Sequence, residues 1–294
     1  MSDTTATEAA SPRYDGIETW PDGAVLDALL ENQLSAVAAV RAAVPASAAA
    51  AAAIPRLRAG GRLAYTGAGT SGRIAVQDGA ELPPTFGWPS HRLMLLVAGG
   101  PEALLRAVEG AEDAPADPAG LQREDVLVAV AASGATPFTL FAVAAARAAG
   151  ALTIGLANNP GAPLLTQSEC PILLPTGPEP LAGSTRMGAG TAQKAALNLW
   201  STLVMMRLGR VYRGRMVDVL ATNAKLRRRS VRMLAELGGV DEAAAAAALA
   251  EADGSVKVAL LVLRGMSGPA ARSRLASAGG DLRAVLGEAR GGNT

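Results

Sequence analysis

Residues 62–73 carry the sequence RLAYTGAGTSGR, in which a short apolar run leads into a loop with three glycines. Such a run is typical of a buried strand, and the residues after the loop have helical spacing. Free N–H groups at the start of a helix attract anions, and Thr70 and Ser71 add hydroxyl donors. The loop matches the dinucleotide motif only in part and lacks the lysine of a P-loop. It therefore predicts either an anion-binding turn or a purely structural one.

Four more apolar runs follow, with helical patterns between them. The five predicted strands are residues 62–66, 93–98, 126–131, 152–156 and 171–174. Helices are expected to begin near Gly72, Pro101 and Pro137. Continuous apolar strands that alternate with helices indicate a parallel sheet covered on both faces, and right-handed crossovers make it a doubly wound α/β layer. In such sheets ligands bind at the carboxyl ends of the strands.

The remainder of the chain is predicted to be helical. Four segments are expected: a flexible arm (1–20), N-terminal helices (21–58), the α/β domain (59–215) and a small all-helical C-terminal extension (216–294). Within the α/β domain, residues 184–208 are predicted to form one long helix. Because this helix carries few charges, we expect it to be buried in the core or against a partner subunit.

The composition excludes several classes of protein. A hydrophobic content of 50% over 294 residues excludes disorder for most of the length. The net charge of +1 provides no overall field to attract nucleic acid or an acidic membrane. A single cysteine, Cys170, and a single histidine, His91, exclude a disulfide framework and multi-histidine metal sites. Without a recognisable signal peptide or a membrane-spanning run, the expectation is a cytoplasmic protein.

A second loop, ASGATP at residues 132–137, also follows a predicted strand and precedes a helix. Pro137 suits the first turn of that helix. Two loops of hydroxyls and glycines on neighbouring strands are more specific than one, because together they can hold a phosphate without a cation. Ordinary Ser and Thr helix caps remain the structural alternative.

Two groups of carboxylates follow these strands. Asp78 and Glu81 lie three residues apart, and the pair Pro83-Pro84 is expected to end their helix, which places Glu81 in its last turn. A carboxylate there opposes the helix dipole, which favours a functional role slightly. The second group, residues 109–113, includes Glu112, and the residues alone favour a solvated acidic turn there over a functional group.

Seven stretches, taken in order, resemble the family of N-acetylmuramic acid 6-phosphate etherases. They are residues 67–73, 78–87, 98–100, 108–113, 132–137, 182–194 and 216–226. The resemblance covers roughly residues 60 to 230. It implies a sugar isomerase (SIS) fold, a homodimer and a cytoplasmic lyase of peptidoglycan amino-sugar recycling. The implied substrate is N-acetylmuramic acid 6-phosphate, the products are N-acetylglucosamine 6-phosphate and D-lactate, and no metal or organic cofactor is implied.

The resemblance also implies roles for individual residues. Glu81 matches the proton donor and Glu112 the partner base. The residues expected to hold the phosphosugar are Gly69, Thr70, Ser71, Ser133, Gly134, Thr136 and Ser184. The residue types suit the chemistry. Once the sugar ring opens, the C3 ether lies β to the C1 aldehyde, so that a base can take the C2 proton while an acid protonates the departing lactate oxygen.

The chain departs from the family pattern at several positions. Gly188 stands where the family usually has lysine, so that a cationic substrate contact or a structural ion pair is missing. Gly79 and Leu82 replace the usual serine and cysteine beside Glu81. The N-terminal arm keeps only Thr7-Glu8 of a longer signature. Two alternatives share the fold class: an aldose–ketose phosphate isomerase, and a non-catalytic sugar-phosphate sensor, which would not need both glutamates.

Overall fold

The computed structural model describes residues 5–43, 46–115, 118, 120–219 and 224–288. The first four residues of the predicted arm, and residues 220–223 of the last family-like stretch, lie outside this description. The chain divides into two compact units: Met1–Ala80 with His91–Thr202, and Glu81–Ser90 with Leu203–Thr294. No helix of the described residues is long and apolar enough to cross a bilayer.

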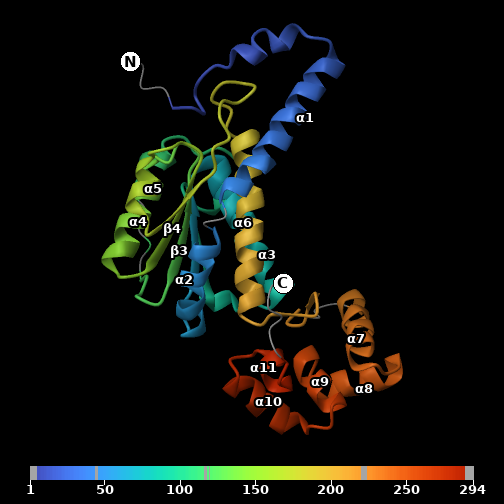
Figure 1. Cartoon of the computed structure of the whole chain (residues 1–294). Helices are drawn as coiled ribbons and strands as arrows, with labels where there is room; N and C mark the ends of the chain where they lie inside the picture. Colours follow the sequence, from blue (N-terminus) through green and yellow to red (C-terminus); the bar gives the residue numbers. More distant parts are fainter. Residues whose placement is uncertain (1–4, 44–45, 116–117, 119, 220–223, 289–294) are drawn as a thin grey trace. The chain divides into compact units, whose positions relative to one another are not determined.

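The first unit is built on a five-stranded parallel sheet, as the sequence predicted (Figure 1). Its strands are β1 (Leu63–Gly67), β2 (Leu93–Val97), β3 (Val126–Val130), β4 (Leu152–Ala157) and β5 (Cys170–Leu173). Their order is β2-β1-β3-β4-β5, so that β1 and β3, which precede the two glycine-containing loops, are neighbours. The residues of β1, β3 and β4 are buried throughout, because helices cover both faces.

Helices pack on both faces of this sheet. The helices of the first unit are α1 (Asp22–Ala39), α2 (Ala46–Arg58), α4 (Pro137–Ala148) and α5 (Pro163–Gln167), while α3 (Gly69–Phe86) and α6 (Gly188–Arg207) begin in this unit. Figure 1 shows α4 and α5 on one side of the sheet and α6 on the other. Small residues allow close packing here: Ala142, Val143 and Ala146 of α4 contact Leu127 and Ala129 of β3 in one buried cluster.

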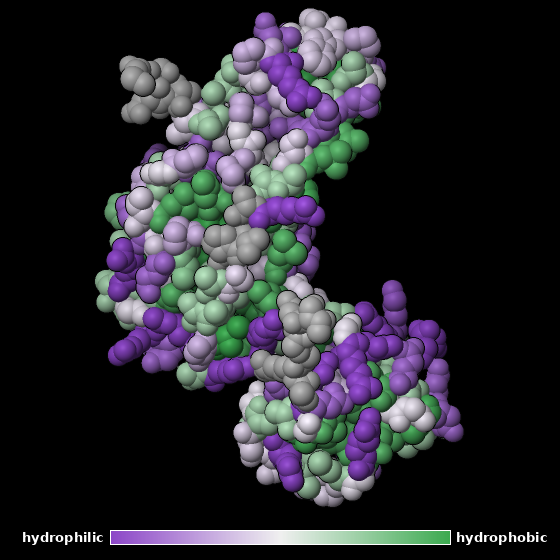
Figure 2. All heavy atoms as spheres, in the orientation of Figure 1, coloured by the Kyte–Doolittle hydropathy of each residue, from purple (hydrophilic) through white to green (hydrophobic). Residues whose placement is uncertain are grey.

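Helix α1 has two contrasting faces. Ala28, Asn32 and Ala36 are buried on one face. The opposite face carries large apolar side chains that remain in solvent, and Figure 2 shows hydrophobic residues at the surface of this helix. They are Leu26, Leu30, Leu34 and Val37, with exposed fractions of 66%, 57%, 63% and 50%. Their spacing at i, i+4, i+8 and i+11 places them in one stripe.

Two expectations about helices were wrong. The helix expected from Pro101 is a single 3-10 turn, Pro101–Leu104. Ala103 is the one buried residue of this turn and Leu105 is 93% exposed, so the segment buries too little apolar surface to stabilise a longer helix. Pro83-Pro84 does not end α3, which continues to Phe86. Glu81 is therefore followed by another turn of helix and is not in the last one.

At the amino ends of the strands, Asp125 joins the starts of β1 and β3. Its carboxylate accepts hydrogen bonds from the backbone N–H of Arg62 (2.7 Å), the Arg62 guanidinium (2.6 Å) and the backbone N–H of Gln122 (2.8 Å). Burial acts to raise the Asp125 pKa, but these hydrogen bonds and the Arg62 charge outweigh it and lower the pKa.

Asp125→Asn is expected to destabilise the protein by about 2 kcal/mol at pH 7, because it removes charge-assisted hydrogen bonds. The folded pKa of Asp125 lies below its ordinary value of 3.8, so this stabilisation is complete above that value and is lost as the pH falls through the folded pKa. Urea unfolding from pH 8 to pH 3 gives the difference in the free energy of unfolding between wild type and variant. This difference should be constant down to about pH 4 and should shrink below it. A difference that widens in acid would contradict this assignment.

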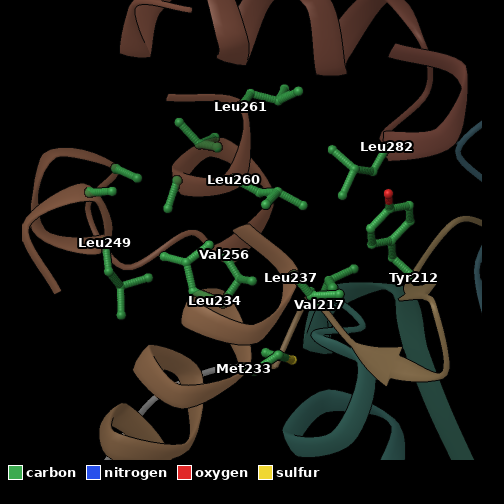
Figure 3. Close-up of a cluster of buried hydrophobic side chains, with 14 of the residues drawn as sticks. Tyr212, Val217, Met233, Leu234, Leu237, Leu249, Val256, Leu260, Leu261 and Leu282 are labelled. Carbon is green, nitrogen blue, oxygen red and sulfur yellow. The ribbon is translucent and has the colours of Figure 1, made fainter. Parts of the chain in front are cut away.

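The second unit is mainly helical, as expected for the C-terminal extension. Its helices are α7 (Ala224–Gly238), α8 (Glu242–Glu251), α9 (Val256–Leu263), α10 (Gly268–Ser277) and α11 (Leu282–Leu286). A short antiparallel pair, β6 (Val211–Tyr212) and β7 (Arg215–Met216), precedes them, and the sequence did not predict it. Figure 3 shows the core, in which Leu234, Leu260 and Tyr212 come from α7, α9 and β6.

A buried ion pair ties this unit together. The Lys257 ammonium, whose side chain is 7% exposed, donates to Asp218 Oδ2 (2.6 Å) and to the carbonyl oxygen of Gly280 (2.7 Å). Arg210 lies 3.7 Å from the same carboxylate and donates to the carbonyl oxygens of Phe86 and Gly87 (2.8 Å each). Burial lowers the pKa of Lys257, while Asp218 acts in the opposite direction. The pair therefore connects the segment after β7 to α9.

Candidate functional site

A cavity of about 370 Å³ lies at the carboxyl ends of β1 and β3 in the first unit. This is the edge of the sheet where the sequence predicted a ligand. The lining residues are Glu8, Ala68, Gly69, Thr70, Ser71, Glu112, Asp113, Ala131, Ala132, Ser133, Ala135, Thr136, Pro137 and Thr185. None of these is a lysine, arginine or histidine, so this cavity offers an anion only hydroxyl and amide donors.

The first loop is shaped by glycines that let two backbone segments touch. A Cβ on Gly67 would lie 2.8 Å from the carbonyl oxygen of Val130, and one on Gly72 would lie 2.7 Å from that of Gly67. Helix α3 begins directly at Gly69, with φ +53. The free N–H groups of its first turn therefore lie at the cavity, beside the hydroxyls of Thr70 and Ser71.

The second loop has the same design on the neighbouring strand. Gly134 has φ +68, and a Cβ there would lie 2.5 Å from the Cβ of Ala162. Thr136 is the N-cap of α4, but its hydroxyl makes no capping hydrogen bond. Ser133 Oγ accepts only a long hydrogen bond from the N–H of Ala135 (3.2 Å). Both hydroxyls line the cavity and keep capacity for a ligand.

The structure brings most of the predicted site residues together. Those that line the cavity are Gly69, Thr70, Ser71, Ser133, Thr136 and Glu112. Glu112 lies on a 3-10 turn, Ala111–Asp113, between β2 and β3. Gly134 supports the second loop without lining the cavity, and at the third segment Thr185 lines it in place of the predicted Ser184.

Glu81 is not among the lining residues. It is exposed on α3, ten residues beyond Ser71, which corresponds to about 15 Å along the helix axis. Its role therefore rests on the family resemblance, whereas the cavity itself supports that of Glu112.

Asp78, the neighbour of Glu81 in the sequence motif, has a structural environment. It is 2% exposed and accepts hydrogen bonds from Tyr65 Oη (2.9 Å), Asn198 Nδ2 (2.6 Å) and Ser201 Oγ (3.2 Å). Burial raises the pKa of Asp78, and these three hydrogen bonds oppose part of the rise. The side chain joins β1, α3 and α6, and no such partners were visible in the sequence.

The departure from the family pattern at Gly188 lies at the start of α6, outside the cavity lining. The N–H groups of Gly188 and Ala189 each donate to the buried carboxylate of Glu179 (2.8 Å). A Cβ on Gly188 would lie 2.8 Å from Asn32 Oδ1 and 3.2 Å from Glu179 Oε2. The Cβ of any residue at position 188 would therefore meet Asn32 and Glu179, and position 188 itself does not line this cavity.

Two polar residues of the lining, Glu8 and Asp113, were not predicted as site residues, and for Thr185 the sequence left open whether it caps the long helix or reaches the site. Asp113 and Thr185 lie inside family-like stretches, beside residues that were singled out. Glu8 lies in the predicted arm, and its only signal was that Thr7-Glu8 survives from a longer family signature.

Known proteins resemble this chain over nearly its full length. Residues 47–146 match the model of the glucokinase regulatory protein N-terminal SIS domain, and residues 104–206 match that of the SIS domain. A relative from Deinococcus radiodurans, named N-acetylmuramic acid 6-phosphate etherase, is 53% identical, with 98% of this chain and 97% of the relative covered. A relative of the same name from Rubrobacter xylanophilus is 46% identical, with 97% of this chain and 96% of the relative covered. Another, from Streptomyces coelicolor, is 44% identical, with 98% of this chain and 96% of the relative covered.

Proposed function

Because the chain belongs to the N-acetylmuramic acid 6-phosphate etherase family, as its motifs predicted, we propose that it cleaves the D-lactyl ether of N-acetylmuramic acid 6-phosphate. The products are N-acetylglucosamine 6-phosphate and D-lactate, and the process is the recycling of cell-wall amino sugars. The proposal places the reaction in the cytoplasm, where the charge of a phosphorylated sugar retains it, and it involves no metal or organic cofactor.

One observation carries this proposal: a single cavity combines two hydroxyl-and-amide loops with Glu112. The loops suit a phosphate, because Thr70, Ser71, Ser133 and Thr136 present hydroxyls beside the start of α3. The carboxylate suits proton transfer at the sugar carbons. The cavity thus has separate groups for phosphate binding and for taking the C2 proton, while Glu81, the proton donor assigned by the family motif, does not line it.

The reaction proceeds by elimination and then addition. With the ring open, Glu112 takes the C2 proton, the C3–O bond breaks, and Glu81 gives its proton to the lactate oxygen. A double bond forms between C2 and C3. Water then adds at C3: Glu81 takes a proton from the water, and Glu112 returns its proton to C2. Both carboxyl groups are thereby back in their starting protonation states. The assignment of Glu81 follows the family motif, and that of Glu112 has the additional support of its position in the cavity.

The purified protein should release D-lactate from N-acetylmuramic acid 6-phosphate, measured by a coupled D-lactate dehydrogenase assay. Stoichiometric N-acetylglucosamine 6-phosphate should accumulate. Binding of the phosphosugar without lactate would make the protein a sensor, and interconversion of aldose and ketose phosphates would make it an isomerase. Either result would overturn the proposal.

A homodimer is part of the proposed function, and the stripe of Leu26, Leu30, Leu34 and Val37 on α1 supports it. Four large apolar side chains at least half exposed on one helix face are costly in water. The same helix buries its other face within its own chain, so the stripe is available to a second copy.

The variant Leu30→Glu/Leu34→Glu should sediment as a monomer at concentrations at which wild type is dimeric, because like charges then face each other across the contact. Analytical ultracentrifugation measures this. The control is Leu105→Glu, which alters a still more exposed leucine elsewhere and should leave the dimer intact. A dimer that persists in the double variant would exclude this stripe as the interface.

A further inference from the structure

The segment around Thr7 is fixed to the cavity by contacts with residues far along the chain. Thr7 is completely buried. Its N–H donates to Asn159 Oδ1 (3.2 Å), and Asn159 Nδ2 donates to Thr7 Oγ1 (2.9 Å) and to the carbonyl oxygen of Ala132 (2.9 Å). The N–H of Gly183 donates to the carbonyl oxygen of Thr7 (3.2 Å). The segment is therefore held against both the second loop and the residues that precede α6.

These contacts place the carboxylate of Glu8 in the lining of the cavity. Gly183, with φ +75, makes room for it, because a Cβ there would lie 2.7 Å from Glu8 Oε2. Among the described residues, the Glu8 carboxylate has no hydrogen-bond or ion-pair partner, although its neighbour Thr7 is fully bonded. Glu8 is exposed, so its carboxylate is open to solvent at the cavity, and its fixed backbone keeps it in place to accept hydrogen bonds from a ligand.

The chemistry of the cavity limits what Glu8 can bind. A carboxylate accepts hydrogen bonds and repels a phosphate or the carboxylate of a lactyl group. The phosphate already has donors in the two loops, and Glu112 has a role in proton transfer. The uncharged donors of the substrate, its hydroxyl groups and its acetamido N–H, have no acceptor assigned among these residues.

We propose that Glu8 is a substrate-binding and specificity-determining residue, which accepts hydrogen bonds from the sugar hydroxyl or amide N–H groups and thereby orients the sugar away from its anionic ends. This inference rests on the proposed function for the identity of the sugar. Glu8 touches the substrate without taking part in the proton transfers. The N-terminal segment is therefore a part of the binding site.

Glu8→Gln should weaken binding of N-acetylglucosamine 6-phosphate about 10-fold or more, since hydrogen bonds to charged groups are worth about 1.5–3 kcal/mol. Calorimetric titration of this product needs no turnover, so its result is independent of whether lactate is released. Inorganic phosphate should bind the variant as well as wild type or better, because a nearby negative charge is removed. Thr7→Val, which removes the hydroxyl that accepts from Asn159, should give a smaller loss in the same direction.

The matched control is Glu18→Gln, an exposed glutamate of the same N-terminal region outside the cavity lining, which should change neither affinity. In the lactate assay, Glu8→Gln should raise KM with little change in kcat. The proposal is overturned if Glu8→Gln binds the sugar phosphate like wild type. It is also overturned if the variant binds sugar phosphate and inorganic phosphate more weakly by the same factor, or if its kcat falls while its KM is unchanged. If wild type releases no lactate, the proposed function fails, and the titrations still decide the role of Glu8.

Discussion

Glu112→Gln should lower kcat for lactate release at least ~100-fold, the usual scale for removing a general base. Glutamine keeps the size of the side chain and still accepts hydrogen bonds, but it cannot take the C2 proton. Binding of N-acetylglucosamine 6-phosphate should stay close to that of wild type, because the phosphate contacts come from the two loops. Glu81→Gln should show a loss of the same scale, through failure to protonate the leaving oxygen.

The matched control is Glu109→Gln, which changes an exposed glutamate three residues earlier that does not line the cavity. Its kcat should remain within about twofold of wild type. Activity retained by Glu112→Gln would remove the main structural support for the proposed chemistry. Activity lost only in Glu81→Gln would mean that the base is another group, and Asp113 would be the first to examine, since it lines the same cavity.

The second large effect concerns the ion pair in the second unit. Asp218→Ala should destabilise that unit by about 3 kcal/mol, because it leaves the buried ammonium of Lys257 without its counter-charge. Native-state hydrogen exchange of the amides of α9 measures the change within this unit alone. Replacing both partners, Asp218→Leu with Lys257→Met, should recover part of the loss, since the apolar pair needs no compensation and Arg210 keeps its hydrogen bonds to the carbonyl oxygens of Phe86 and Gly87.

Glu236→Ala serves as the comparison for this prediction. It removes a surface ion pair between Glu236 and Arg215, in which the Glu236 side chain is 60% exposed and the Arg215 side chain 41% exposed. Such pairs contribute about 0–1 kcal/mol, so protection of α9 should hardly change. If Asp218→Ala changed the hydrogen-exchange protection of α9 as little as Glu236→Ala, the pair of Asp218 and Lys257 would contribute no more to stability than a surface ion pair.

The parallel sheet could be predicted because its signal is local. Each strand is a continuous apolar run, and the predicted limits of 93–98 and 126–131 differ from β2 and β3 by a single residue. The two glycine-containing loops that line the cavity could be predicted for the same reason, since glycines and hydroxyls follow the strands directly. The connection after β2 was predicted less well, because helical spacing alone cannot show whether an apolar face has anything to pack against.

The contacts that the sequence could not reveal are long-range. Glu8 reaches the cavity because Thr7 bonds to Asn159, 152 positions away, and to Gly183. Asp78 accepts a hydrogen bond from Asn198, 120 positions away. The sequence does not show this contact, so spacing alone could not tell which of the two carboxylates, Asp78 or Glu81, has a structural role. Pro83-Pro84 misled for a different reason: the local preference against proline in a helix was overridden by the surrounding fold.

The glycine at position 188 has a consequence for how sequences of this kind can diverge. The amide of Asn32 occupies the space that any side chain at 188 would need, and the Glu179 carboxylate already accepts two N–H groups there. A lysine could enter only if the Asn32 side chain moved aside or residue 32 became smaller at the same time. Positions 32 and 188 are thus expected to covary among related sequences, because the size of the side chain at one position limits the size that fits at the other.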